Sequence, residues 1–233
     1  MKVCLDRRLQ EAYALTPPCV CCADIGTDHG LLPLALLAGG KVQQVVVSDI
    51  SAKALQKAKT LLIQKGYSQQ ATFVVGDGVL GLPCEAQVVS ILGMGGQTIS
   101  HILRTGKEKL ARATLLIGAQ SDLFLVRETL GQLQYTIETE TLVEEGKHMY
   151  VLMRAIPAPH ALYSREACWL GPVLLQKGHP LFEKWLTQRK RCLAHAIQAM
   201  QKAGHDKDAQ RLAQSHEEYG YVEKALQNIQ KER

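Results

Sequence analysis

Short apolar runs alternate with amphipathic segments along the first two thirds of the chain. We predict a β-strand in each of five apolar runs, at residues 19–23, 42–49, 71–75, 87–92 and 115–117. The segments between them predict helices at residues 31–38, 52–65 and 107–112, and a further helix that ends near Leu133. Unbroken apolar strands that alternate with helices are typical of a parallel sheet covered on both faces.

Two other patterns complete the predicted N-terminal domain. Residues 3–14 predict an amphipathic helix that ends before Pro17. Residues 135–143 and 148–153 alternate apolar and polar positions around a turn at Gly146, which is typical of an antiparallel hairpin. Adding this hairpin to the five strands predicts a seven-stranded mixed sheet.

The sequence changes character after Pro157. No strand pattern follows, residues 161–176 are mixed, and two helices are predicted, one from His179 to about Ala203 and one from Asp206 onward. Their apolar stripes would pack together as an antiparallel hairpin, which is a short coiled coil. We therefore expect a domain at residues 1–157 and a helical hairpin at residues 158–233.

Most of the excess positive charge lies in this hairpin. The chain of 233 residues has a net charge of +5, and residues 160–233 hold 12 Lys or Arg against 8 Asp or Glu. The domain that precedes them is therefore nearly neutral. A basic surface of this kind is compatible with a polyanionic partner.

The seven cysteines indicate a reducing compartment rather than a metal site. Their spacing fits no zinc ribbon, and three of them lie in the predicted strand at residues 19–23, where cysteine packs as a small apolar residue. We expect reduced thiols in a cytoplasmic protein without a bound metal. The sequence has neither a secretory leader nor an apolar run of membrane-spanning length, so we expect no membrane partner.

Acidic residues follow three of the predicted strands. Asp24, Asp49 and Asp77 stand at carboxyl ends, where ligands bind in open α/β sheets. Asp49 suits ribose hydroxyls, Asp77 suits the amine of an adenine, and Asp24 suits a sulfonium or ammonium group. Together they predict a ligand that contains adenosine. A nicotinamide dinucleotide is the alternative, but Gly26 and Gly30 do not form its complete glycine fingerprint.

The strand pattern resembles the Rossmann-like sheet of class I S-adenosylmethionine-dependent methyltransferases. Four motifs resemble one group within that class, the bacterial TrmK family of tRNA (adenine(22)-N1)-methyltransferases: DIGTDHG at 24–30, VVVSDIS at 45–51, GDG at 76–78 and ILGMGG at 91–96. The resemblance extends to residues 5–9, to the segment from Gln120 to Arg127 and to the helical tail. It implies an α/β Rossmann-like domain, S-adenosylmethionine as cofactor, tRNA as partner, and methylation of N1 of adenine 22.

The resemblance also implies roles for individual residues. The cofactor would be bound by Asp24, Gly26, Thr27, Gly30, Asp49, Ile50, Asp77, Gly78 and Gly93. The substrate would be contacted by Met94, Gly95 and Gly96. Apart from the resemblance, the positive charges of Arg7, Arg8 and Arg189 make them candidate contacts to tRNA phosphates. Asp28 is the candidate base near the adenine amine, with capping of the following helix as its alternative role. His29 is the second catalytic candidate, with a structural or orienting hydrogen bond as the alternative.

Two other functions stay open at this stage. A small-molecule methyltransferase on the same fold would bind the cofactor and would keep its activity without residues 160–233. A non-catalytic RNA-binding or scaffolding protein would not bind the cofactor. The sequence does not fix the oligomeric state, although it favours a monomer.

Overall fold

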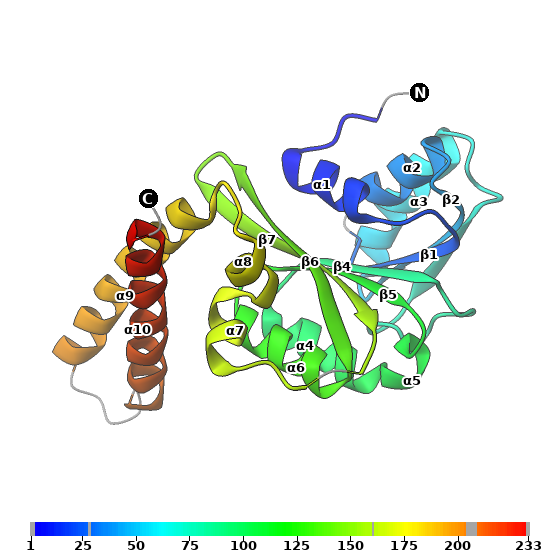
Figure 1. Ribbon diagram of the computed structural model, residues 1–233. Coiled ribbons are helices and arrows are strands. Elements are labelled where there is room, and N and C mark those ends of the chain that lie inside the picture. Colours follow the sequence, from blue (N-terminus) through cyan, green and yellow to red (C-terminus); the bar gives the residue numbers. More distant parts are fainter. Residues whose placement is uncertain (1–2, 28, 160, 204–208, 232–233) are drawn as a thin grey trace. The chain divides into compact units, whose positions relative to one another are not determined.

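The structure is a computed structural model that describes residues 3–27, 29–159, 161–203 and 209–231. It divides into two compact units, Met1–Tyr163 and Ser164–Arg233. The first unit contains the whole sheet, and the second is helical. We describe each unit separately (Figure 1).

The first unit is built on the predicted seven-stranded mixed sheet. Its strands are β1 (Cys19–Ile25), β2 (Val42–Asp49), β3 (Ala71–Val75), β4 (Val88–Met94), β5 (Thr114–Ala119), β6 (Tyr135–Glu145) and β7 (His148–Pro157). They lie in the order β3-β2-β1-β4-β5-β7-β6. The first five strands are parallel, and β7 pairs antiparallel with both β5 and β6. The predicted seven-stranded mixed sheet is thereby confirmed.

Six helices cover the two faces of this sheet. They are α1 (Arg7–Leu15), α2 (Leu31–Ala38), α3 (Ala52–Gln64), α4 (Gly96–Thr105), α5 (Lys107–Leu110) and α6 (Leu123–Gln132). Helices α1 to α3 lie on one face and α4 to α6 on the other (Figure 1). Leu36, Leu62 and Val47 belong to the core beneath α1 to α3, and each is at most 1% exposed. Burial of this apolar surface is what holds the helices on the sheet.

Several predicted bounds differ from the structure, and one helix was missed. The first helix begins at Arg7 rather than residue 3, because the Asp6 side chain caps it by accepting from the Leu9 amide at 2.6 Å. Helix α4, which begins at Gly96, was not predicted. A Cβ on Gly96 would lie 2.5 Å from the carbonyl oxygen of Ser121, so glycine permits the close approach of this segment. Strand β7 extends beyond residue 153 to Pro157.

A buried ion pair joins the α4–α6 face to the antiparallel edge of the sheet. The Arg127 guanidinium on α6 donates from Nε to Glu140 on β6 at 2.8 Å, and both side chains are fully buried. A comparable pair between Arg154 and Glu138 is partly exposed. Burying the first pair fixes the position of α6, because removing either partner would leave an uncompensated charge in the interior.

The second unit consists of α7 (Arg165–Leu170), α8 (Pro172–Lys177), α9 (Phe182–Ala203) and α10 (Ala209–Lys231). The mixed segment therefore contains two short helices. The long helix begins at Phe182, three residues after the predicted start at His179. The predicted cap at Asp206 lies outside the described residues. Helices α9 and α10 lie side by side as the expected hairpin, with Leu193 and Val222 buried between them.

Candidate functional site

The carboxyl ends of the parallel strands bring the predicted cofactor residues to one edge of the sheet. The turn after β1 is tied to β2, because the Gly26 amide donates to the Ser48 carbonyl at 2.8 Å. The turn after β3 is tied to β2 in the same way, from Gly76 to Asp49 at 3.1 Å. Segments that are distant in sequence therefore lie next to each other along this edge.

Asp24 is a buried carboxylate between two strands. It pairs in register with Ser90 on β4, and the Ser90 hydroxyl donates to its Oδ1 at 2.5 Å. Asp24 is only 7% exposed, and this burial raises the pKa of its carboxyl, whereas hydrogen bonds from Ser90 and Thr27 act in the opposite direction. The negative charge of Asp49 raises the pKa further. The site thus holds a desolvated carboxyl that a cationic ligand would stabilise in its ionised form.

Two glycines shape the turn that follows Asp24. Gly26 and Gly30 have φ angles of +75° and +69°, a conformation that favours glycine. A Cβ on Gly26 would lie 1.9 Å from Cε of Met94, and one on Gly30 would lie 2.9 Å from Cβ of Ala58. The turn is therefore packed tightly against β4 on one side and α3 on the other. Met94, predicted to contact the substrate, lies against this turn.

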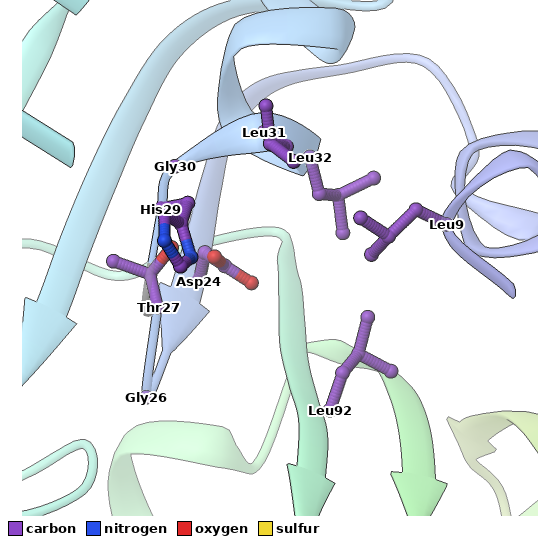
Figure 2. A pocket seen from close by; sticks show the side chains of 9 residues that line it. All are labelled: Leu9, Asp24, Gly26, Thr27, His29, Gly30, Leu31, Leu32 and Leu92. Atoms are coloured by element: carbon purple, nitrogen blue, oxygen red, sulfur yellow. The ribbon is translucent and has the colours of Figure 1, made fainter. Parts of the chain in front are cut away.

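A cavity of about 120 Å³ opens beside the turn (Figure 2). Asp24, Thr27 and His29 line it with polar groups. The apolar wall comes from α1, α2 and β4, and it consists of Leu9, Leu31, Leu32 and Leu92. Gly26 and Gly30 complete the lining. Sites that bind small molecules and cofactors usually enclose at least about 300 Å³, so this cavity suits one end of a larger ligand.

The remaining acidic residues flank the cavity without lining it. Asp49 is half-buried, and its Oδ1 accepts from the Ser51 amide at 2.7 Å. Asp77 is exposed, and Gly78 has a φ angle of +59° and would place a Cβ 3.1 Å from Ile102. Ile50 is 74% exposed, which leaves an apolar surface beside Asp49 for a flat group. An extended ligand could reach from the cavity over β2 to these side chains.

Gly93, a candidate cofactor residue, and the candidate substrate residues Met94 to Gly96 lie at the end of β4 and the start of α4. Gly93 has a φ angle of +77°, and a Cβ there would lie 3.3 Å from Nη1 of Arg8 and 3.9 Å from Nε2 of Gln120. The Arg8 guanidinium carbon also lies 5.3 Å from the ring centroid of Tyr150. Gly95 approaches the Ser121 hydroxyl, and Gly96 starts α4. Arg8 and the segment around Ser121 thus lie close to the glycine segment.

The catalytic and basic candidates differ in their surroundings. Asp28 lies outside the described residues, and His29 is an exposed residue at the rim of the cavity. Arg7 is exposed on α1. Arg189 forms two hydrogen bonds with the carboxylate of Glu218 on α10, whose side chain is 4% exposed. Arg189 therefore holds the hairpin together, and its role toward a substrate stays a prediction.

Sequence reasoning missed several residues of the site. Leu9, Leu92 and Tyr150 are apolar positions that the pattern assigns to packing, and only the tertiary structure places them here. Ser90 carried a usable signal, because it is the one polar residue in the apolar run of β4. A hydroxyl in a buried strand needs a hydrogen-bond partner.

The described residues offer neither a metal site nor a membrane-spanning helix. Among them, no three His, Cys, Asp or Glu side chains gather closely enough to bind a metal ion. No helix within the described part of the chain has the length and apolar character that crossing a membrane requires.

We predict that Asp24→Asn changes how stability depends on pH. The pKa of Asp24 is raised above its ordinary value of 3.8, so the folded state binds this proton more tightly than the unfolded chain. The free energy of unfolding of the native protein therefore falls as pH rises from about 4 through the raised pKa, and the loss persists at higher pH. The variant lacks this loss, so its melting temperature relative to that of the native protein should increase as pH rises from about 4 through the raised pKa and should then level off. A relative melting temperature that decreases with pH would contradict the assignment.

Comparisons with known proteins agree with this geometry. Residues 5–153, more than half of the chain, match the family model described as a methyltransferase domain. The tRNA (adenine(22)-N(1))-methyltransferase of Bacillus subtilis is 28% identical over 216 residues, which cover 89% of this chain and 91% of that protein.

Two solved structures share the fold over nearly the whole chain. The crystal structure of B. subtilis TrmK, an m1A22 tRNA methyltransferase, has a TM-score of 0.86 at 24% identity and covers 97% of this chain and 100% of that one. M. capricolum TrmK, solved with S-adenosyl-homocysteine, has a TM-score of 0.80 at 21% identity, covering 96% and 98%. The strand order, the cavity at the carboxyl ends and the matched domain lead to one assignment: the chain belongs to the methyltransferase domain family.

Proposed function

We propose that this protein transfers a methyl group from S-adenosylmethionine to N1 of an adenine in tRNA, at position 22. The observation that carries the proposal is the buried carboxyl of Asp24 in the wall of the cavity, which suits a ligand with a cationic end. The printed function of the B. subtilis relative supports the choice of substrate. The cofactor in the M. capricolum complex supports the choice of ligand.

The residues at the sheet edge fit this cofactor. Asp24 would face the ammonium group of its methionine end, in the cavity. Asp49 would accept hydrogen bonds from the ribose hydroxyls, because one of its oxygens is anchored by Ser51 and the carboxylate is thereby oriented. Ile50 would lie against the adenine and Asp77 would accept from its amine. The turn from Gly26 to Gly30 would let the backbone approach the ligand closely.

Catalysis of this methyl transfer depends mainly on positioning the adenine against the methyl group. S-adenosylmethionine supplies a methyl group that its positively charged sulfur activates for transfer. N1 of adenine carries a lone pair in the plane of the ring, so holding it in line with that methyl provides most of the catalysis. The segment from Gly93 to Gly96 lacks side chains except at Met94, and it leaves room for a flat base. Because N1 lies on the pairing edge, the adenine must leave its stack before it can react.

Methylation makes the base cationic, so a nearby carboxylate would stabilise the product or accept a proton from the amine. Asp28 is our candidate for this carboxylate. The structure places Gly30, which has no side chain, at the N-cap position of α2. His29 at the rim of the cavity would orient the base or Asp28 by a hydrogen bond.

A basic stripe on α9 suits the tRNA backbone. Arg191 and Lys202 are exposed on the same face of this helix, eleven residues or about three turns apart. Neither takes part in an ion pair among the described residues, in contrast to Arg189 and Lys190, which bind Glu218 and Glu223. Basic side chains of this kind bind phosphates without reading sequence.

The decisive experiment is methyl transfer to tRNA with mapping of the product. Protein, S-adenosylmethionine with a labelled methyl group and unmodified tRNA should yield one N1-methylated adenine, at position 22. A tRNA with guanine at position 22 serves as the matched control and should stay unlabelled. Transfer only to small molecules would replace the proposal by a small-molecule methyltransferase, and absence of cofactor binding would indicate a non-catalytic protein.

We expect Asp28→Asn to lower kcat about 10²- to 10⁴-fold, the usual contribution of a general base, with little change in cofactor affinity. The measurement is single-turnover methyl transfer combined with calorimetric titration of the cofactor. His29→Gln is the neighbouring control and should have a smaller effect. A variant that keeps its kcat and loses only about 1 kcal/mol of stability would instead assign Asp28 a structural role.

We expect Arg191→Glu to weaken tRNA binding and to reduce the slope of log K against log salt by about 1 to 2. The helical signal and melting temperature should stay unchanged, because the side chain is exposed. Lys65→Glu, an exposed position at the end of α3, makes the same change in net charge and is the control. An equal loss in both variants would mean that only net charge matters and would argue against the α9 stripe.

A further inference from the structure

Arg8 lies near the cofactor cavity, next to residues of two different elements that border it. Its chain neighbour Leu9 lines the cavity from α1, and its guanidinium lies beside Gly93, whose own neighbour Leu92 lines the cavity from β4. An atom placed where a Cβ of Gly93 would stand lies 3.3 Å from Nη1 of Arg8. Arg8 thus presents hydrogen-bond donors at the boundary between the cavity and the glycine segment.

The guanidinium is held in place without being neutralised. Its carbon lies 5.3 Å from the ring centroid of Tyr150, within the range of a cation–π contact. No carboxylate of the described residues lies within ion-pair distance of Arg8. A half-buried, positioned and uncompensated cation is a binding group for an anion.

An acidic side chain, Asp24, lines the same cavity, together with Leu9, the chain neighbour of Arg8. An α-amino acid carries an ammonium and a carboxylate on one carbon, so it needs an anion and a cation a short distance apart. We propose that Arg8 binds the α-carboxylate of S-adenosylmethionine while Asp24 faces its ammonium group. This inference rests on the proposed function, and it reassigns Arg8 from the tRNA to the cofactor.

A small carboxylate fits this position better than an RNA phosphate does. Arg8 is half-buried, and the leucines next to it in sequence and in space enclose the cavity on both sides. Nε2 of Gln120 lies 3.9 Å from the same point above Gly93 and adds a second donor. A cation directed at the base would oppose the positive charge that methylation creates, so we expect Arg8 to bind at the amino-acid end.

The test compares two ligands by calorimetric titration of the full chain, without tRNA. Decarboxylated S-adenosylmethionine keeps the sulfonium and the ammonium and lacks only the carboxylate. We expect Arg8→Ala to weaken binding of S-adenosylmethionine about 10- to 100-fold, and to change binding of the decarboxylated ligand by less than about threefold. The native protein should itself bind the decarboxylated ligand more weakly. Arg8→Lys, which keeps the charge and loses the planar fork, should be intermediate.

Arg112→Ala is the matched control, because it removes an exposed arginine remote from the cavity and should leave both affinities unchanged. Melting curves without ligand establish that each variant is folded. Equal weakening of both ligands would overturn the inference and make Arg8 a packing residue. Unchanged affinity for S-adenosylmethionine with weaker tRNA binding would overturn it in favour of a phosphate contact. Failure of the native protein to bind S-adenosylmethionine at all would instead overturn the proposed function.

Discussion

The site depends on the place in the sheet where the strand order reverses. The hydrogen bond between Ser90 and Asp24 joins the two strands there. Strand β1 lies between β2 and β4, so the chain leaves β1 in one direction along the sheet and later returns on the other side. Such a reversal of strand order opens a crevice at the carboxyl ends of the two strands. Asp24 and Ser90 face each other across that crevice, and the carboxyl is buried there despite the unfavourable desolvation that raises its pKa. The fold retains a destabilising group where a cationic ligand can compensate it.

Much of this arrangement could be predicted from the sequence. Strands β1 to β4 are mostly apolar runs that end in or next to glycine or aspartate, and both signals are local. The positions of Asp24 and Asp49 at one edge followed from the parallel topology alone. The wall of the cavity could not be predicted, because Leu9 comes from a helix that precedes the sheet and packs on it only through tertiary contacts. The start of α4 was missed for a related reason, since Gly96 reflects close packing against Ser121.

The hairpin shows why a count of charges does not identify a binding surface. Its excess of basic residues was evident in the sequence, but the structure divides them into two groups. Arg165, Arg189 and Lys190 bind glutamates of α10, and the buried partner of Arg189 makes that pair part of the packing. Arg191, two residues along the same helix, points to another face and is exposed. Only residues of this second group can bind a phosphate without losing an ion pair that stabilises the hairpin.

Helix α1 links the fold of the first unit to the polarity of its cavity. Asp6 caps the first turn of α1. At the other end of the helix, the Lys41 ammonium donates to the carbonyls of Tyr13 and Thr16, at 2.6 and 2.8 Å. Desolvation lowers the pKa of Lys41, as expected for a cation drawn into a packed helix end. With both ends fixed, α1 has little freedom to shift along the sheet, so the Arg8 guanidinium is already placed before any ligand arrives. Preorganisation of this kind reduces the entropy lost on binding, so the proposed contact of Arg8 with a ligand carboxylate would need little rearrangement of the protein.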